Sequence, residues 1–244
     1  MKNIVIVGGT SGIGFETALL FLKKGYTVGI AGRRAELLEP LVKMYPQSCL
    51  AKAIDINSDD SGDMLKAFIE ELGGMDIYLH AAGIGYNNPK LDYVKEINTA
   101  KTNCVGFTRM ITVAYSYLGS HGGGQIAIIS SIAGVKGIGT APAYSATKRF
   151  QNTYIDALSQ LSRMEKANIY FTDIRPGFVD TPLLKQGSYP MLMKPDFVAG
   201  KIFKAIIDKK RNIIIDWRYR LMVYGWRIIP EWLWERLSIK SKKQ

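Results

Sequence analysis

The sequence predicts an α/β fold, a doubly wound parallel sheet in a single domain with helices on both of its faces. Short Ile- and Val-rich runs, typical of buried parallel strands, alternate along the chain with segments of helical pattern. A glycine-rich loop joins the first of these runs to the first helix. The chain has 244 residues, of which 47% are hydrophobic, and this suits one domain with a full core.

The predicted elements begin with a strand at 2–7, a loop at 8–14, a helix at 15–24 and a strand at 26–31, which together form a βαβ unit. Beyond this unit we expect helices at 35–45, 58–72, 99–118, 142–166 and 195–208, and strands at 50–54, 76–81, 125–130, 169–174 and 212–215. The core domain is therefore expected to cover residues 1–215. Residues 216–244 form a C-terminal extension, either part of the same domain or an interfacial tail.

The glycine loop after the first strand predicts a dinucleotide site. Gly8 allows a tight turn, Gly12 lets backbone N–H groups approach a pyrophosphate, and Gly14 lets the helix pack close to the strand. The positive end of the helix dipole then faces the phosphates. The spacing is GxxxGxG, which differs from the generic GxGxxG, and a tight turn without ligand is the alternative.

Gly32, Arg33 and Arg34 follow the second strand, where an acidic residue would hydrogen-bond the adenosine ribose. Two arginines can instead clamp a 2′-phosphate, so the cofactor is predicted to be NADP(H). The alternative is that both arginines are the solvated start of a helix, although positive charge is mildly unfavourable there.

Tyr144 and Lys148 lie four residues apart in a predicted helix and therefore on one face of it. A nearby ammonium favours the phenolate, so we expect Lys148 to lower the pKa of Tyr144. Such a pair can move a proton to or from an alcohol or carbonyl. Alone the pattern is weak, because YxxxK also arises in exposed helices.

Together these motifs resemble those of the short-chain dehydrogenase/reductase family, whose fold is Rossmann-like, from residue 2 to about residue 215. Ala82-Gly83 match the end of the family's Asn-Asn-Ala-Gly motif, although His80 and Ala81 replace the two Asn. Asn103 and Ser131 stand 41 and 13 residues before Tyr144, where the family has its catalytic Asn and Ser. The segment 176–181 matches the family's Pro-Gly segment.

The resemblance implies four catalytic residues, Asn103, Ser131, Tyr144 and Lys148. Its cofactor contacts are expected from Gly8, Thr10, Ser11, Gly12, Ile13, Gly14, Arg33, Arg34, Asp55, Ile56, Ala82, Gly83, Asn103, Tyr144, Lys148, Pro176, Gly177, Val179 and Thr181. No metal site is expected, because the sequence offers only two histidines. His80 is expected to be structural, either replacing the hydrogen bonds of the family's Asn or lying buried and neutral with one satisfied nitrogen.

The expected reaction is NADP(H)-dependent hydride transfer with a ketone or secondary alcohol. Ser131 would polarise the carbonyl, Tyr144 would transfer the proton, and Asn103 would hold a water linking Lys148 to solvent. The substrate is expected to be lipophilic, because the segment 182–194 is apolar: Leu183, Leu184, Tyr189, Met191, Leu192 and Met193. An epimerase or dehydratase of the family and a non-catalytic dinucleotide sensor or scaffold are the alternatives.

Composition limits location and partners. The two cysteines form no disulfide framework, and we expect a reducing, cytoplasmic location. No nucleic-acid-binding motif accompanies the net charge of +11. Between 209 and 244, ten Lys/Arg stand against three Asp/Glu, so this region alone carries +7. A homodimer or homotetramer is implied by the resemblance.

The C-terminal extension contains all four tryptophans, interleaved with arginines, and Pro230 divides it into two short helices. Aromatic and basic side chains together suit a membrane interface, so peripheral membrane contact through residues 216–239 is one interpretation. The other is that the apolar side of the extension packs on the domain or on a partner subunit.

Overall fold

The computed structural model describes residues 2–184 and 189–237. Its centre is a seven-stranded sheet, all of whose pairings are parallel, in the order β3-β2-β1-β4-β5-β6-β7. The strands are β1 (Asn3–Val7), β2 (Thr27–Gly32), β3 (Cys49–Ala53), β4 (Ile77–His80), β5 (Gly124–Ile129), β6 (Ile169–Arg175) and β7 (Asn212–Ile214). The predicted doubly wound parallel sheet is confirmed.

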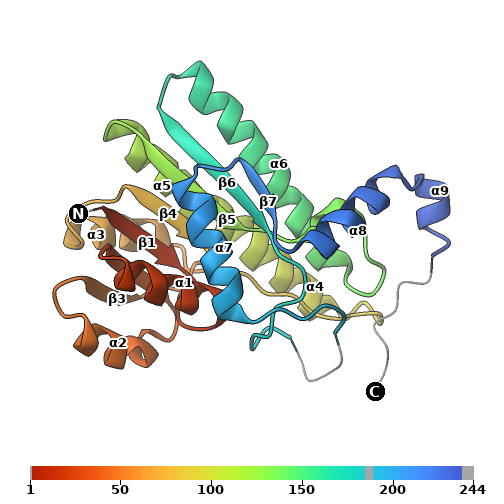
Figure 1. The fold of residues 1–244 in the computed structure, drawn as a ribbon, viewed down its shortest axis with the longest axis horizontal. Helices are drawn as coiled ribbons and strands as arrows, with labels where there is room; N and C mark the ends of the chain where they lie inside the picture. Colours follow the sequence, from red (N-terminus) through yellow and green to blue (C-terminus); the bar gives the residue numbers. More distant parts are fainter. Residues whose placement is uncertain (1, 185–188, 238–244) are drawn as a thin grey trace.

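Helices cover both faces of this sheet (Figure 1). They are α1 (Gly12–Lys23), α2 (Glu39–Met44), α3 (Ser61–Glu71), α4 (Tyr93–Ala100), α5 (Phe107–Ser120), α6 (Pro142–Met164), α7 (Pro195–Ile207), α8 (Trp217–Ile228) and α9 (Glu231–Trp234). Alternate residues of β1 supply the two cores: Ile4 and Ile6 pack with α1 and α7, while Val5 and Val7 pack with α3 and α5. Because side chains alternate between the two faces of a strand and both faces are covered, β1 is apolar from Ile4 to Val7.

Two predicted helices differ from the observed ones. The segment 35–45 is not one α-helix, because residues Ala35–Leu38 form a 3₁₀ turn and α2 begins only at Glu39. Pro40 stands in the first turn of α2, where its missing N–H costs no hydrogen bond. The long helix expected from residue 99 begins at Tyr93, where Asp92 accepts a hydrogen bond from the backbone N–H of Lys95 as its N-cap.

A π-helical segment, Lys101–Gly106, interrupts that long helix between α4 and α5. Such segments are rare and are frequent at functional sites. Asn103 lies within it. The sequence predicted one continuous helix over 99–118, and only the structure shows the interruption.

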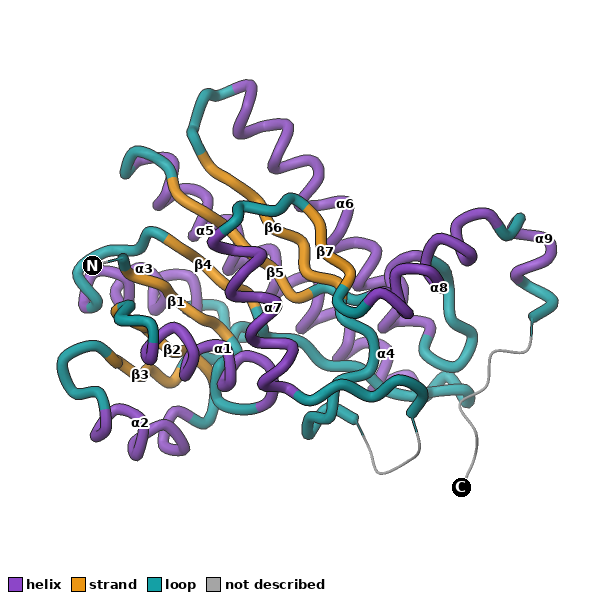
Figure 2. Tube along the Cα trace, viewed as in Figure 1, coloured by secondary structure: helices purple, strands orange, loops and turns teal. Residues whose placement is uncertain are grey.

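The C-terminal extension forms α8 and α9, with Ile229 and Pro230 between them, as the position of Pro230 predicts. Both helices extend from the end of β7 away from the sheet (Figures 1 and 2). One side of the extension packs on the domain: Tyr219 and Val223 are buried, and Trp234 Nε1 donates to the Gly137 carbonyl at 2.7 Å. Trp226 meets Trp234 edge-on at 5.3 Å. The packing interpretation therefore holds for this side.

Candidate active site

From β1, the strands β2 and β3 follow on one side of the sheet and β4 to β7 follow on the other. A topological switch point therefore lies between β1 and β4. In open parallel sheets, ligands bind at such a point, beyond the carboxyl ends of the strands. The glycine loop follows β1, the loop containing Ala82 and Gly83 follows β4, Ser131 follows β5, and the Pro-Gly segment follows β6. These segments, distant in the sequence, therefore meet at one edge of the sheet.

The glycine loop fits against its neighbours only because its glycines have no Cβ. A Cβ on Gly8 would come within 2.3 Å of the Ala82 backbone N, and Gly8 has a φ of +90°. A Cβ on Gly14 would lie 2.3 Å from the Gly8 carbonyl oxygen, so the start of α1 packs directly on the turn. Gly12, with a φ of +57°, faces the Thr181 side chain. The structure thus joins three predicted cofactor segments around the N-terminus of α1.

The end of β2 lies beside the glycine loop. A Cβ on Gly32 would stand 2.8 Å from Thr10 Cγ2, and Arg34 Nη2 donates to Ser11 Oγ at 3.3 Å. Both Arg33 and Arg34 are exposed. The two arginines therefore border the loop with their guanidinium groups accessible to a ligand.

Asp55 and Ile56 follow β3 and lie at the rim of this site. The Asp55 carboxylate accepts from the Asn57 backbone N–H at 3.1 Å and is otherwise exposed. Ile56 is buried, and its carbonyl accepts from Arg109 Nη1 at 3.1 Å. The side chain of Ile56 also lies against Gly106 of the π-helical segment. These contacts fix the turn at which the predicted adenine-side residues stand.

Tyr144 lies in the first turns of α6, partly buried. Burial raises the pKa of the Tyr144 phenol, and a hydrogen bond with the Ser131 side chain opposes this rise. The expected lowering of this pKa by Lys148 is not observed: the net direction is upward through burial, and the Lys148 ammonium lies 5.8 Å from the Tyr144 ring centroid. The contact with Ser131 is thus the one that brings the pKa of the Tyr144 phenol back towards its ordinary value.

Lys148 is 5% exposed and points into the protein. Its Nζ donates to the Ile129 carbonyl at 2.9 Å and to Gln151 Oε1 at 3.0 Å. Burial lowers the pKa of Lys148 to about 8, and the nearby carboxylate of Asp173 opposes the decrease. An amine with a pKa of about 8 is still mostly charged at pH 7 and can exchange its proton near neutral pH.

Asn103 is fully buried and ties the loop after β4 to α6. Its Oδ1 accepts from the Ile84 N–H at 2.9 Å, while its Nδ2 donates to the Ile84 carbonyl at 2.7 Å and to Thr147 Oγ1 at 3.0 Å. The Asn103 backbone carbonyl accepts from Gln151 Nε2 at 3.0 Å. Gln151 therefore connects Lys148 with the backbone of Asn103.

Sequence analysis missed three residues of this site, and Gln151 is the first. The second is Gly85, where a Cβ would come within 2.4 Å of Tyr144 Cδ2, so the absence of a side chain makes room for the phenol ring. The third is Tyr219 of α8. Helical spacing from Lys148 could have indicated Gln151, but no local pattern marks Gly85 or Tyr219.

Tyr219 anchors the C-terminal extension to the Pro-Gly segment. Its ring fills the space above Gly177, where a Cβ would meet it at 2.2 Å. Its hydroxyl accepts from the Phe178 N–H at 3.1 Å and donates to the Pro190 carbonyl at 2.8 Å. Val179, buried, forms a bridge with Met193. The extension therefore holds both ends of the segment in which substrate contacts are expected, of which 185–188 lie outside the described residues.

His80 is 1% exposed, and its Nδ1 lies 3.0 Å from the Tyr78 hydroxyl. The Phe107 ring meets the imidazole edge-on at 5.0 Å. Burial, assisted by the charge of Lys148, lowers the pKa of His80 to about 3. His80 is thus neutral near pH 7, which agrees with the expectation of a structural, buried imidazole.

We predict that His80 makes the protein acid-sensitive. Between pH 6.5 and about 3, the unfolded chain binds a proton on this residue that the folded chain excludes, so stability falls as the pH falls. Between pH 7 and pH 4.5, the free energy of unfolding in urea should fall by about 2 kcal/mol less for His80→Asn than for the wild type. The matched control is His121→Asn, because His121 is exposed. Equal losses in the wild type and His80→Asn would refute the prediction.

The described residues, 2–184 and 189–237, contain no group of three or more His, Cys, Asp or Glu side chains placed to hold a metal ion. Within the same ranges, none of the helices has the length and apolar character needed to cross a membrane.

Comparison with known proteins adds independent findings. Residues 2–189 match the family model described as short chain dehydrogenase. An uncharacterized oxidoreductase of Mycobacterium tuberculosis is 30% identical over 254 residues, covering 97% of each chain. Dehydrogenase/reductase SDR family member 7B of Mus musculus is 27% identical, covering 99% of this chain and 81% of the relative.

Solved structures share the fold. The 3-ketoacyl-(acyl-carrier-protein) reductase from Brucella melitensis, complexed with NADH, has a TM-score of 0.79 and 25% identity, covering 88% of this chain and 96% of its own. ElxO with NADP bound has a TM-score of 0.80 and 22% identity, covering 90% and 99%.

Proposed function

The chain belongs to the short-chain dehydrogenase family and is an oxidoreductase of that kind, and from this premise we propose that it transfers hydride between NADP(H) and a ketone or secondary alcohol. The observation that carries the proposal is the assembly of Ser131, Tyr144 and Lys148 beyond the carboxyl ends of the strands, with the Ser131 hydroxyl bonded to the Tyr144 phenol. These are the groups that proton transfer to a carbonyl oxygen requires.

The residues present fit a dinucleotide. Gly8 and Gly12 have positive φ and place backbone, rather than side chains, at the N-terminus of α1, where a pyrophosphate can be held. Thr181 closes over Gly12 from the other side. The bound nicotinamide supplies or accepts the hydride. Lys148 would hold the ribose hydroxyls of that cofactor.

In the reductive direction, Ser131 donates a hydrogen bond that holds and polarises the substrate carbonyl, and Tyr144 delivers the proton to its oxygen. The raised pKa of Tyr144 keeps the phenol protonated and thus ready to act as the acid. Gln151 and the Asn103 carbonyl hold Lys148 behind the phenol, which keeps its proton close to Tyr144. In the oxidative direction the same groups remove the proton from an alcohol.

A lipophilic substrate is supported by the surroundings of the segment after β6. Phe178 packs on Tyr189 with ring centroids 4.9 Å apart. Leu183 and Leu192 are 47% and 43% exposed, so apolar side chains of this segment remain available to a ligand. Apolar contact of this kind favours a hydrophobic ketone or alcohol.

The preference for NADP(H) rests on this chain's own residues, since one structural neighbour holds NADH and another holds NADP. We expect Arg33→Ala to weaken binding of NADPH by at least tenfold and to leave NADH binding nearly unchanged, because only NADPH carries the 2′-phosphate that a guanidinium can pair with. Fluorescence titration of both cofactors measures this. Equal losses for the two cofactors would contradict the phosphate clamp.

The proposed reaction is tested by NADPH fluorescence on titration, followed by NADPH consumption with a panel of ketones that differ in apolar size. We expect binding, and turnover that rises with the apolar size of the ketone. Binding without turnover on any carbonyl would favour a dinucleotide sensor instead.

A further inference from the structure

A second site-like feature lies away from the catalytic residues. A cavity of about 600 Å³, open to solvent on one side, lies between α6, α8 and the edge of the sheet at β6 and β7. Five cationic side chains line it, with Asp156 as the one acidic residue among the lining: Arg149, Arg175, Lys210, Arg220 and Arg227.

The cavity is separated from the catalytic site by α6 itself. Tyr144, Lys148 and Gln151 share one face of this helix, whereas the cavity is lined by Arg149, Asn152, Thr153 and Asp156, a spacing of i, i+3, i+4 and i+7. At 100° per residue, the centres of these two faces lie about 120° apart. A ligand in the cavity would therefore not touch the catalytic groups.

Most of the positive charge in this cavity is not neutralised by the protein. Arg175 pairs with Asp173 at 2.6 Å, Lys210 with Asp208 at 3.7 Å, and Asp156 is taken by Arg211 at 2.5 Å. Over the described part of the chain, Arg149, Arg220 and Arg227 have no carboxylate within 4.0 Å. Three unpaired guanidinium groups around one cavity repel one another, and an anion between them would relieve this repulsion.

The geometry points to an anion site, and we propose that this cavity binds a phosphate group through Arg149, Arg220 and Arg227. Guanidinium groups bind phosphate oxygens in a bidentate manner, and three of them suit a group with several such oxygens.

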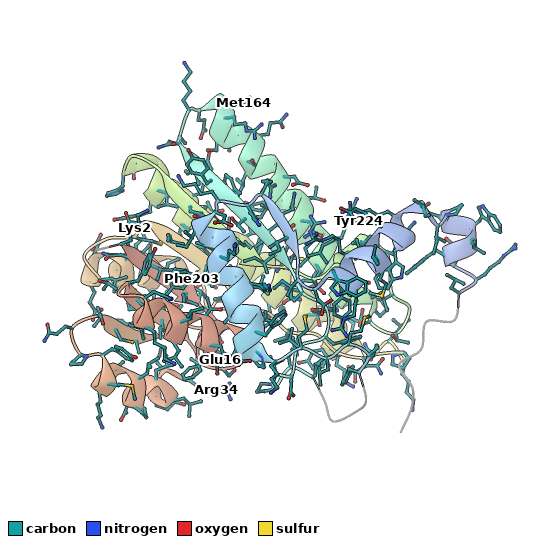
Figure 3. The ribbon with its side chains drawn as sticks, in the orientation of Figure 1. Lys2, Glu16, Arg34, Met164, Phe203 and Tyr224 are labelled. Atoms are coloured by element: carbon teal, nitrogen blue, oxygen red, sulfur yellow. The ribbon has the colours of Figure 1, made fainter. Side chains whose placement is uncertain are left out.

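The source of the phosphate is suggested by the outer face of α8. Trp217, Leu221, Tyr224 and Ile228 are 67%, 61%, 55% and 83% exposed. At 100° per residue these four fall within about 60° of arc, and we call them the α8 stripe. Tyr224, labelled in Figure 3, belongs both to the stripe and to the cavity lining. Arg220 and Arg227 stand between the stripe and the buried side of α8.

An apolar stripe edged by arginines matches a membrane surface, where apolar side chains enter the headgroup boundary and cations meet anionic lipids. The phosphate of a lipid headgroup could thus enter the cavity while the stripe contacts the acyl region. A soluble phosphate compound shares the same chemistry but makes no use of the stripe. The following experiment separates these two sources.

The test measures binding of the full chain to pyrophosphate by calorimetry, with NADPH at saturation so that the glycine loop is occupied, and to vesicles of phosphatidylcholine mixed with phosphatidylglycerol by flotation. The cavity variant is Arg220→Ala/Arg227→Ala, because both side chains are exposed and neither has a carboxylate partner. The matched control is Lys201→Ala/Lys204→Ala on α7, which removes the same charge outside the cavity. A third variant, Leu221→Ser/Ile228→Ser, alters only the stripe.

We expect the cavity variant to bind the phosphate source about 25-fold more weakly than the wild type, given roughly 1 kcal/mol for each arginine at an anionic surface. The control should bind like the wild type. If the cavity variant and the stripe variant both bind vesicles more weakly than the wild type, the phosphate comes from a lipid. If the cavity variant binds pyrophosphate more weakly and the stripe variant binds like the wild type, the phosphate is soluble. If the wild type binds neither source, or if cavity and control variants lose equally, the proposal is overturned.

Discussion

Tyr144→Phe is expected to lower the turnover number by about 10²–10⁴-fold, the contribution typical of a positioned general acid or base. The substitution removes only the phenol oxygen, which bonds with Ser131, and it keeps the ring against Gly85. Because the ring still fills its place, the fold and the affinity for NADPH should stay close to those of the wild type. Steady-state kinetics on a ketone identified as a substrate, together with NADPH titration, measures both quantities.

Tyr154→Phe serves as the control for this prediction. Tyr154 lies on the same helix, and its hydroxyl makes one long contact, 3.4 Å from Thr112 Oγ1. The control should therefore retain wild-type turnover. If Tyr144→Phe also retained it, the proton would have to come from another group and the assignment of Tyr144 would be wrong.

Asp173→Ala is expected to lower the free energy of unfolding by about 3–5 kcal/mol, because it leaves a buried cation without its partner. The Asp173 carboxylate is fully buried and accepts from Arg175 Nε at 2.8 Å, from Arg175 Nη2 at 2.6 Å and from Asn152 Nδ2 at 2.9 Å. It also accepts from the Ser130 hydroxyl. Four donors thus depend on one side chain, and urea unfolding at pH 7 measures their loss.

Asp156→Ala provides the comparison for the buried pair. Asp156 pairs with Arg211 at 2.5 Å, but its side chain is 63% exposed, so its loss should cost less than about 1 kcal/mol. A double variant, Asp173→Ala/Arg175→Met, should recover part of the stability by removing the orphaned charge. Equal losses in the two single variants would show that burial adds nothing to the Asp173 pair.

Sequence periodicity and motif spacing were enough to predict the class of fold, and they named residues that the structure brings together at one edge of the sheet. The alternation of buried strands and amphipathic helices follows from local hydrophobic pattern, and a parallel sheet is the arrangement that buries such strands on both faces. Glycines at 8, 12 and 14 likewise act locally, since each removes a Cβ where backbone approaches backbone. The spacing of Asn103, Ser131 and Tyr144 then identified the family.

Tertiary structure alone decided how these groups interact. The pKa of Tyr144 is set mainly by burial, which depends on the whole surrounding structure and cannot be deduced from a lysine four residues away. Gln151 joins Lys148 to the Asn103 carbonyl, which lies 3.0 Å from its amide within the π-helical segment, a link that the sequence motifs did not predict. Tyr219 reaches Gly177 from 42 residues further along the chain, a contact that no local pattern encodes. Local sequence patterns therefore predict the helices, strands and glycine turns. Contacts between segments far apart in the sequence depend instead on how the entire chain packs.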